Sequence, residues 1–282
     1  MSPFEFLRPA RLDEAVASLR AGGAEAVALA GGMTLIPTMK HALANPVRLV
    51  DLSAITELRG VSLHAGELVI AAMSTHAQVA NDPLVRSNLT ALASLAAGIG
   101  DTEVRHRGTI GGSLATNDPS ADYPAACLAL QATLTTDRRS IPADRYFQGL
   151  FRTALSPGEI ITAVRFKPPR HAAYIKFPNQ ASRYATVGVF VAQWPHTVRV
   201  AVTGASREGV LRLPGVEQAL MHTFSVEALP PHGIAQDTIM DDIHARARYR
   251  SHLVDVGLRR AVAACLGIEP QGPRRHGGAH SL

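Results

Sequence analysis

The residues of this chain that are best suited to chemistry gather at positions 107–122, which read RGTIGGSLATNDPSAD. Gly111 and Gly112 have no Cβ and can adopt positive φ, so the backbone here can lie directly against a ligand. Thr109 and Ser113 place hydroxyl groups beside the same amides. Successive free N–H groups in such a turn form a concavity that binds anions such as a diphosphate. The alternative is a tight surface turn, because glycine pairs also punctuate ordinary loops.

A second glycine turn, AGGMT at residues 30–34, follows an apolar segment at 26–29 that predicts a buried strand. A short helical piece and a strand at 48–52 come next, so the turn ends the first strand of a β-turn-α-β unit. The third glycine of the dinucleotide-binding fingerprint is replaced by Ile36, and we therefore reject a nicotinamide site. Asp51 stands where a ribose-binding acid would lie, but we expect it to cap or close the unit.

The two turns together predict two backbone anion cradles that one long ligand with a central diphosphate could bridge. Neutral amides and hydroxyls suit a diphosphate that is held in place. A nucleotide hydrolase would instead need the lysine and the Mg²⁺ ligand of a P-loop, and the chain has no such motif. It also has no G-x-S-x-G nucleophile elbow. A bound FAD fits this pattern, although the spacing alone does not require it.

Composition excludes several classes of protein. Aromatic residues make up only 5% of the chain and the net charge of +5 is scattered, which argues against a nucleic-acid partner. Cys127 and Cys265 are too few to hold an iron–sulfur cluster, and no zinc-type spacing of Cys and His occurs, so we expect no metal. The N-terminus has no signal-peptide pattern and no apolar run is long enough for a membrane span. We therefore expect a soluble, cytoplasmic protein.

Hydrophobic periodicity predicts an α+β chain in which these turns are held by short strands and helices. The best domain boundary is KPPR at residues 167–170, because consecutive prolines break both helices and sheet ladders. The predicted elements are a helix around residues 12–19, a hairpin at 61–64 and 68–72, a buried helix at 124–130, and strands at 133–136, 160–166, 173–177, 186–194 and 198–203. An amphipathic helix follows at about 241–265, with its arginines outward.

Two motifs give the chain a resemblance to a known family. LAGGMTLIPTMK at residues 29–40 and RGTIGGSLATNDPSADYPA at 107–125 resemble the two diphosphate loops of the FAD-binding medium subunits of molybdenum hydroxylases, of the aerobic carbon monoxide dehydrogenase and xanthine dehydrogenase type. The resemblance extends from Phe4 to about Cys265. It implies a PCMH-type FAD-binding domain at 1–169, made of a small βαβ subdomain and a mixed α/β subdomain. A C-terminal domain at 170–268, with a small antiparallel sheet and helices, and a disordered tail at 269–282 would follow.

The same resemblance implies FAD as the cofactor and assigns residues to its site. Asp122 would accept hydrogen bonds from sugar hydroxyls, with a helix N-cap as the alternative. Lys176 would donate toward the flavin and Tyr184 would lie near its face; the alternatives are a solvated strand lysine and a half-buried strand tyrosine. The predicted cofactor-binding residues are Ala30, Gly31, Gly32, Met33, Thr34, Thr109, Ile110, Gly111, Gly112, Ser113, Asp122, Ile161, Lys176 and Tyr184.

The resemblance implies an oxidoreductase component: an FAD-carrying electron-transfer subunit of a heterotrimeric molybdenum hydroxylase. Its partners would be a molybdopterin-binding large subunit and an iron–sulfur small subunit, and it would pass electrons to an external acceptor. We expect no catalytic residue on this chain, because the substrate would bind elsewhere. Two alternatives stay open: a stand-alone flavin oxidase, with His106 as the nearest residue for a covalent link, and a scaffold subunit that has lost FAD. Departures from the family pattern at Met33, Ser113 and Arg183 are the features that could support the scaffold.

Overall fold

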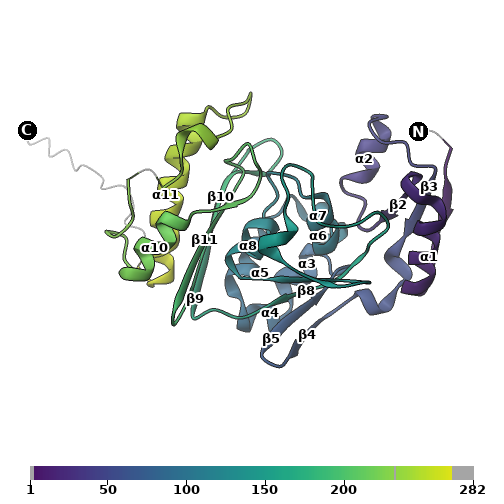
Figure 1. Cartoon of the computed structure of the whole chain (residues 1–282), viewed down its shortest axis with the longest axis horizontal. Helices are drawn as coiled ribbons and strands as arrows, with labels where there is room; N and C mark the ends of the chain where they lie inside the picture. Colours follow the sequence, from purple (N-terminus) through teal and green to yellow (C-terminus); the bar gives the residue numbers. More distant parts are fainter. Residues whose placement is uncertain (1–2, 232, 269–282) are drawn as a thin grey trace, which may run out of the picture.

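The computed structural model describes residues 3–231 and 233–268 and arranges them in three parts that follow one another along the chain (Figure 1). The first part is a small parallel sheet with strand order β1-β3-β2. Strands β2 and β3 are neighbours and pair in parallel, and α2 connects them along the chain, as the β-turn-α-β prediction requires. The elements are β1 (Glu5–Leu7), α1 (Leu12–Gly22), β2 (Ala26–Leu29), α2 (Leu35–Lys40) and β3 (Arg48–Asp51).

The middle part is an antiparallel sheet with strand order β4-β5-β8-β6-β7, packed against short helices. Apolar side chains from both, such as Ile70, Leu92 and Leu134, form the largest buried cluster. The elements are β4 (Val61–His64), β5 (Glu67–Ala71), α3 (His76–Asn81), α4 (Pro83–Asn88), α5 (Thr90–Ala97), α6 (Thr102–Arg107), α7 (Ile110–Thr116), α8 (Tyr123–Ala129), β6 (Thr133–Thr136), β7 (Ser140–Pro142), α9 (Ala143–Tyr146) and β8 (Ile161–Phe166).

The third part is an antiparallel sheet with strand order β12-β11-β10-β9. Alternate residues of β10 point to opposite faces. Val189 joins a buried cluster with Val254 of α11, while Phe190 joins the main cluster of the middle part. The predicted boundary at 167–170 therefore separates two sheets that share one core. The elements are β9 (His171–Pro178), β10 (Ala185–Trp194), β11 (Thr197–Thr203), β12 (Leu211–Arg212), α10 (Pro214–His222) and α11 (Ala247–Cys265).

The predicted α+β class is confirmed, and so is the role of Asp51. Its carboxylate accepts hydrogen bonds from the amide and the hydroxyl of Ser53, at 2.9 and 2.8 Å, and thereby begins a 3-10 turn after β3. Strand β2 is half-buried rather than buried, and its residues Val27 and Ala28 line a cavity. The predicted tail at 269–282 lies outside the described residues, and the division at residues 169 and 170 stays a prediction.

Two features of the last helix were predicted wrongly. It begins at Ala247 instead of about residue 241, and Arg250 points inward with only 3% of the residue exposed. The Arg250 guanidinium donates to the carbonyl oxygens of Thr186 and Gly204, both at 2.6 Å, and to the Asp242 carboxylate at 2.8 Å. Helical periodicity predicts the face of the helix on which a residue lies. Only the tertiary contacts show that Arg250 finds hydrogen-bond acceptors in the protein interior.

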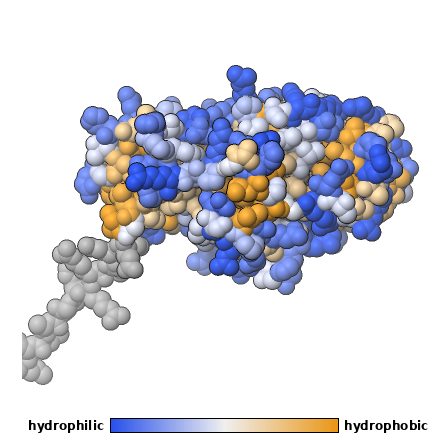
Figure 2. All heavy atoms as spheres, turned by 90° about the horizontal axis from the view of Figure 1, so that it is seen from below, coloured by the Kyte–Doolittle hydropathy of each residue, from blue (hydrophilic) through white to orange (hydrophobic). Residues whose placement is uncertain are grey.

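Figure 2 shows hydrophilic side chains over most of one face, interrupted by smaller apolar patches. Within residues 3–231 and 233–268, no helix combines the length and the apolar character needed to cross a membrane. The more exposed apolar side chains include Phe6, Leu43 and Phe151.

Candidate cofactor site

The two glycine stretches meet at one cavity of about 440 Å³ that also reaches the edge of the third part of the molecule. Its size is that of an ordinary small-molecule site. Ile110 and Lys176 do not line it: Ile110 is fully buried, and the Lys176 ammonium donates to Asp122 and to the carbonyl of Gly98 behind the cavity wall. The other twelve predicted residues do line it: Ala30, Gly31, Gly32, Met33, Thr34, Thr109, Gly111, Gly112, Ser113, Asp122, Ile161 and Tyr184.

Backbone contact between the two stretches shapes the cavity. A Cβ on Gly31 would lie 2.1 Å from the carbonyl oxygen of Arg107 and 2.8 Å from the Cα of Gly108. Only glycine therefore lets the first turn rest on the end of α6. Gly32 has a φ of +73°, a conformation that other residues adopt at a cost. No described residue accepts a hydrogen bond from the amides at positions 31–35, so this turn keeps free donors for an anion.

The second glycine stretch is built differently from the predicted turn. Gly111 and Gly112 lie in the first turn of α7 and neither has positive φ. The amides of Ile110 and Gly111 donate to the carbonyls of Ser74 and Ala72, and those of Gly112 and Ser113 donate to Thr109. These four amides are thus not free donors, which corrects the prediction of a second backbone cradle. The hydroxyl groups of Thr109 and Ser113 are the remaining donors here.

Close packing, not turn geometry, explains the glycine at position 111. A Cβ there would lie 2.6 Å from the Cβ and 2.8 Å from the carbonyl oxygen of Ala72. At position 112 a Cβ would come within 3.0 Å of the Thr109 hydroxyl and 3.4 Å of the Ala30 Cβ. Both glycines therefore hold the α7 N-terminus against the other walls of the cavity.

Asp122 is fixed by two residues of β9. Its carboxylate oxygens accept hydrogen bonds from the Tyr174 hydroxyl at 2.5 Å and from the Lys176 ammonium at 2.9 Å. Asp122 does hold the N-cap position of α8, as the alternative predicted, but its side chain makes no capping hydrogen bond there. Burial raises the pKa of Asp122, and the contacts with Lys176 and Tyr174 act against that rise. Lys176 is no solvated lysine either, since its side chain is only 10% exposed.

Tyr184 and Arg183 form the wall that the third part contributes. Tyr184 is 43% exposed and lines the cavity, and its hydroxyl contacts the side chain of Thr34 in the first glycine turn. Burial raises the pKa of Tyr184, the Asp118 carboxylate raises it further, and the hydrogen bond with Thr34 lowers it. Arg183 has a φ of +61°, which turns the chain so that both side chains reach the cavity.

His76 also lines the cavity, and the sequence analysis missed it. Its ring packs at 5.4 Å from the Tyr123 ring, and its Nδ1 is buried without a hydrogen-bond partner among the described residues. Burial and the positive charge of Arg105 lower the pKa of His76 to about 4, so the ring is neutral at pH 7. His76 is the first residue of α3, after the N-cap Thr75, and nothing in this local context signals that it lines a cavity.

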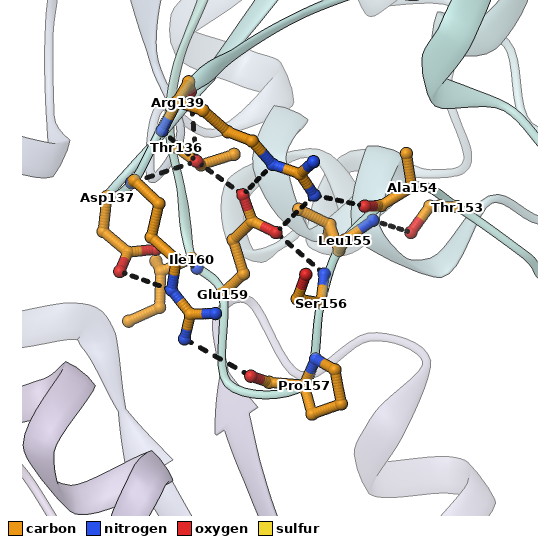
Figure 3. A network of polar contacts seen from close by, with 11 residues as sticks. Thr136, Asp137, Arg139, Thr153, Ala154, Leu155, Ser156, Pro157, Glu159 and Ile160 are labelled. Carbon is orange, nitrogen blue, oxygen red and sulfur yellow. Dashed lines mark hydrogen bonds and ion pairs between the residues drawn. The ribbon is translucent and has the colours of Figure 1, made fainter.

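Glu159 is a second residue of the cavity wall that the sequence analysis missed. Its carboxylate accepts hydrogen bonds from Arg139 (2.9 Å), the Thr136 hydroxyl (2.8 Å) and the Ser156 amide (2.8 Å), as Figure 3 shows. Together with the bond from the Ile160 amide to Asp137, these contacts fasten the loop before β8 to the end of β6. The hydrogen bonds from Arg139 lower the pKa of Glu159 to about 2.

We expect Glu159→Gln to destabilise the folded protein by about 2 kcal/mol at pH 7, because hydrogen bonds to a charged acceptor are lost. The folded-state pKa lies below the usual 4.5 of glutamate, so this stabilisation is present above pH 4.5 and is lost as the pH falls toward 2. Urea unfolding at pH 7 and at pH 3 measures the difference between variant and parent, which should shrink in acid. The exposed Glu103→Gln is the control and should change neither value; an equal loss at both pH values would contradict the prediction.

His106 is the residue that a covalent flavin link would require. Its Nδ1 lies 2.8 Å from the carbonyl oxygen of Thr102 and donates to it, and the side chain does not line the cavity. The structure therefore does not bring His106 to the cavity that the two glycine stretches form.

Comparison with known proteins shows which family the chain belongs to. Residues 2–169 match the family described as the FAD binding domain in molybdopterin dehydrogenase. The chain belongs to this family. It is the FAD-binding component of an oxidoreductase, and FAD is its cofactor.

Individual relatives resemble this flavoprotein over nearly its whole length. The carbon monoxide dehydrogenase medium chain of Hydrogenophaga pseudoflava is 33% identical, over 93% of this chain and 96% of that one. A solved structure of that dehydrogenase aligns with a TM-score of 0.85 and 32% identity, covering 94% of this chain and 98% of the other. The nicotine 6-hydroxylase medium subunit of Paenarthrobacter nicotinovorans is 31% identical, over 91% of this chain and 95% of that one.

The residues present fit FAD on their own chemistry. The free amides at positions 31–35 and the hydroxyls of Thr109 and Ser113 can donate to a diphosphate. The Asp122 carboxylate can accept hydrogen bonds from sugar hydroxyls. Apolar side chains such as Ile99 and Ile161 supply walls for ring systems. Met33 and Ser113, where the chain departs from the family pattern, both line the cavity, and Ser113 keeps a hydroxyl that can donate or accept a hydrogen bond.

Proposed function

We propose that this chain is the FAD-carrying electron-transfer subunit of a heterotrimeric molybdenum hydroxylase or dehydrogenase. Its partners would be a molybdopterin-binding large subunit and an iron–sulfur small subunit, and electrons would leave to an external acceptor. The observation that carries the proposal is the contact of Gly31 with the Arg107 backbone, which joins both glycine stretches into one cavity. The names of the relatives support it, since "medium chain" and "medium subunit" imply larger and smaller partner chains.

The residues of the chain hold the cofactor and do no chemistry on an organic substrate. FAD, when bound, can exchange electrons singly or in pairs and so connects one-electron carriers with two-electron acceptors. The glycine turn at 31–35 and the α7 N-terminus would hold the diphosphate, and Asp122 the sugar hydroxyls. The pKa of His76 is lowered to about 4, which makes the ring a weak base with no imidazolium proton to give at pH 7, and Asp122 is tied to Lys176. Bound substrate would have to lie on a partner subunit.

The test compares the full chain alone with the chain plus the two proteins proposed as partners. The purified chain should be yellow, and acid should release FAD from it. A reduced organic substrate should leave the flavin absorbance unchanged with the chain alone and bleach it when both partners are present. Bleaching by the substrate without partners would contradict the proposal in favour of an oxidase, and a chain that binds no FAD would contradict it in favour of a scaffold.

A further inference from the structure

One buried cluster ties the third part of the molecule to the cofactor cavity. Tyr174 and Lys176 lie two residues apart on β9, so their side chains share one face of the sheet. Each donates to a different oxygen of Asp122, at 2.5 and 2.9 Å. The Lys176 ammonium also donates to the carbonyl oxygen of Gly98 at the end of α5, at 3.0 Å. Both oxygens of one carboxylate are therefore held by a single strand that belongs to the other sheet.

A glycine makes room for this cluster. Gly188 lies in the interior of β10 and pairs with Lys176. A Cβ at this position would lie 2.2 Å from the Tyr174 hydroxyl and 2.9 Å from the Thr203 Cγ2. Glycine weakens a strand interior and often marks a close approach of another group. Here that group is the Tyr174 hydroxyl, which donates to Asp122. The glycine at position 188 therefore leaves the space that this hydrogen bond needs.

The two donors act on the cavity only through Asp122. Asp122 lines the cavity, whereas Tyr174 and Lys176 do not. The side chains of Asp122 and Lys176 are 4% and 10% exposed, and a buried charge is stable only with a partner. The other titratable groups that interact with Asp122 are Tyr123, next to it in α8, and Tyr184 across the cavity. Neither is a cation, so Lys176 is the group that compensates the charge of Asp122.

We propose that Tyr174 and Lys176 are positioning residues of the FAD site: they keep the Asp122 carboxylate ionised and fixed, so that it accepts hydrogen bonds from cofactor hydroxyls. This inference rests on the FAD site described above. It also makes the affinity for FAD depend on the docking of the β9–β12 sheet, because both donors come from that sheet. By linkage, bound FAD stabilises the same docking.

The test measures the dissociation constant of FAD for the full chain at pH 7, by flavin fluorescence quenching, in Tyr174→Phe, Gly188→Ala and Lys176→Met. Tyr174→Phe and Gly188→Ala should bind FAD about tenfold more weakly than the parent, and Lys176→Met should bind it more weakly by about tenfold or more. Each substitution removes or displaces a donor to a charged acceptor. Tyr146→Phe is the matched control. It also deletes a buried tyrosine hydroxyl, which donates a hydrogen bond to the Leu114 carbonyl and does not contact Asp122.

The pH dependence separates positioning from a merely structural role. With Lys176 removed, the buried Asp122 loses its cation and takes up a proton at higher pH than in the parent. The FAD affinity of Lys176→Met should therefore rise with pH over a higher pH range than that of the parent, whereas the profile of Tyr146→Phe should match the parent's. If the parent binds FAD and all variants match Tyr146→Phe, the positioning role is wrong while the proposed function stands. A parent that binds no FAD would overturn the cofactor site itself.

Discussion

Replacing Gly31 by alanine should abolish most FAD binding. The new Cβ would lie 2.1 Å from the Arg107 carbonyl oxygen, and the clash is with backbone, so no side-chain rotation relieves it. The first glycine turn must then separate from the end of α6, which opens the cavity where the two glycine stretches meet. Overpacking of this kind costs about 1–3 kcal/mol, and we expect the affinity for FAD to fall roughly a hundredfold. Titration of the full chain with FAD measures this loss directly.

The matched control is Gly215→Ala. Gly215 lies in the first turn of α10, its added Cβ would meet nothing within 4 Å, and its φ is not positive. The same change of one methyl group should therefore leave FAD affinity unchanged and the fold no less stable. Thermal melting of both variants without FAD shows whether Gly31→Ala is still folded. A folded Gly31→Ala variant with the affinity of the parent would show that contact between the two stretches does not build the site.

Replacing Arg250 by methionine should produce the largest loss of stability. The buried guanidinium joins α11 to the carbonyls of Thr186 and Gly204 and to the Asp242 carboxylate. Its removal leaves two carbonyls without this donor inside the protein and takes the cationic partner from the Asp242 carboxylate, which keeps only the amides of His244 and Ala245; breaking such an ion pair costs about 3–5 kcal/mol. Burial acts to raise the pKa of Asp242, yet the hydrogen bonds from Arg250 keep it below its usual value. Chemical denaturation at pH 7 gives the loss as a difference in the free energy of unfolding.

Arg246→Met provides the comparison on the same helix terminus. The Arg246 side chain is 86% exposed and makes only a 3.5 Å ion pair with Asp241. Exposed pairs contribute about 0–1 kcal/mol, so this variant should unfold at nearly the parent's denaturant concentration. Similar losses in the two variants would mean that Arg250 is not a structural anchor of the third part.

The local sequence was sufficient to predict those elements whose structure depends only on neighbouring residues. The strand–turn–helix–strand pattern around residues 26–52 and the hairpin around Gly66 follow from apolar alternation and turn residues, and both are confirmed. The glycine stretches were found because glycine has no substitute where backbones touch. Their mechanism was misjudged at Gly111 and Gly112, because a glycine in the sequence does not reveal whether φ or space is the reason.

The residues missed or misassigned share one property: their role is set by partners far away in the chain. His76 and Glu159 lie in ordinary local contexts, and only the fold brings them to the cavity wall. Lys176 was predicted to donate toward the flavin, and that stays a prediction; the sequence did not reveal that its ammonium donates to Asp122, 54 positions earlier. Arg250 was predicted to face water, because its acceptors Thr186 and Gly204 also lie far away in the chain.

The sequence by itself determined the α+β class, the two glycine stretches and, through its resemblance, the family and its cofactor. The tertiary structure alone decided which amides stay free, which carboxylate is paired, and how the third part holds Asp122. The physical reason is that backbone preference and hydrophobic period act over a few residues, whereas hydrogen-bond satisfaction and desolvation depend on every group that folding brings near.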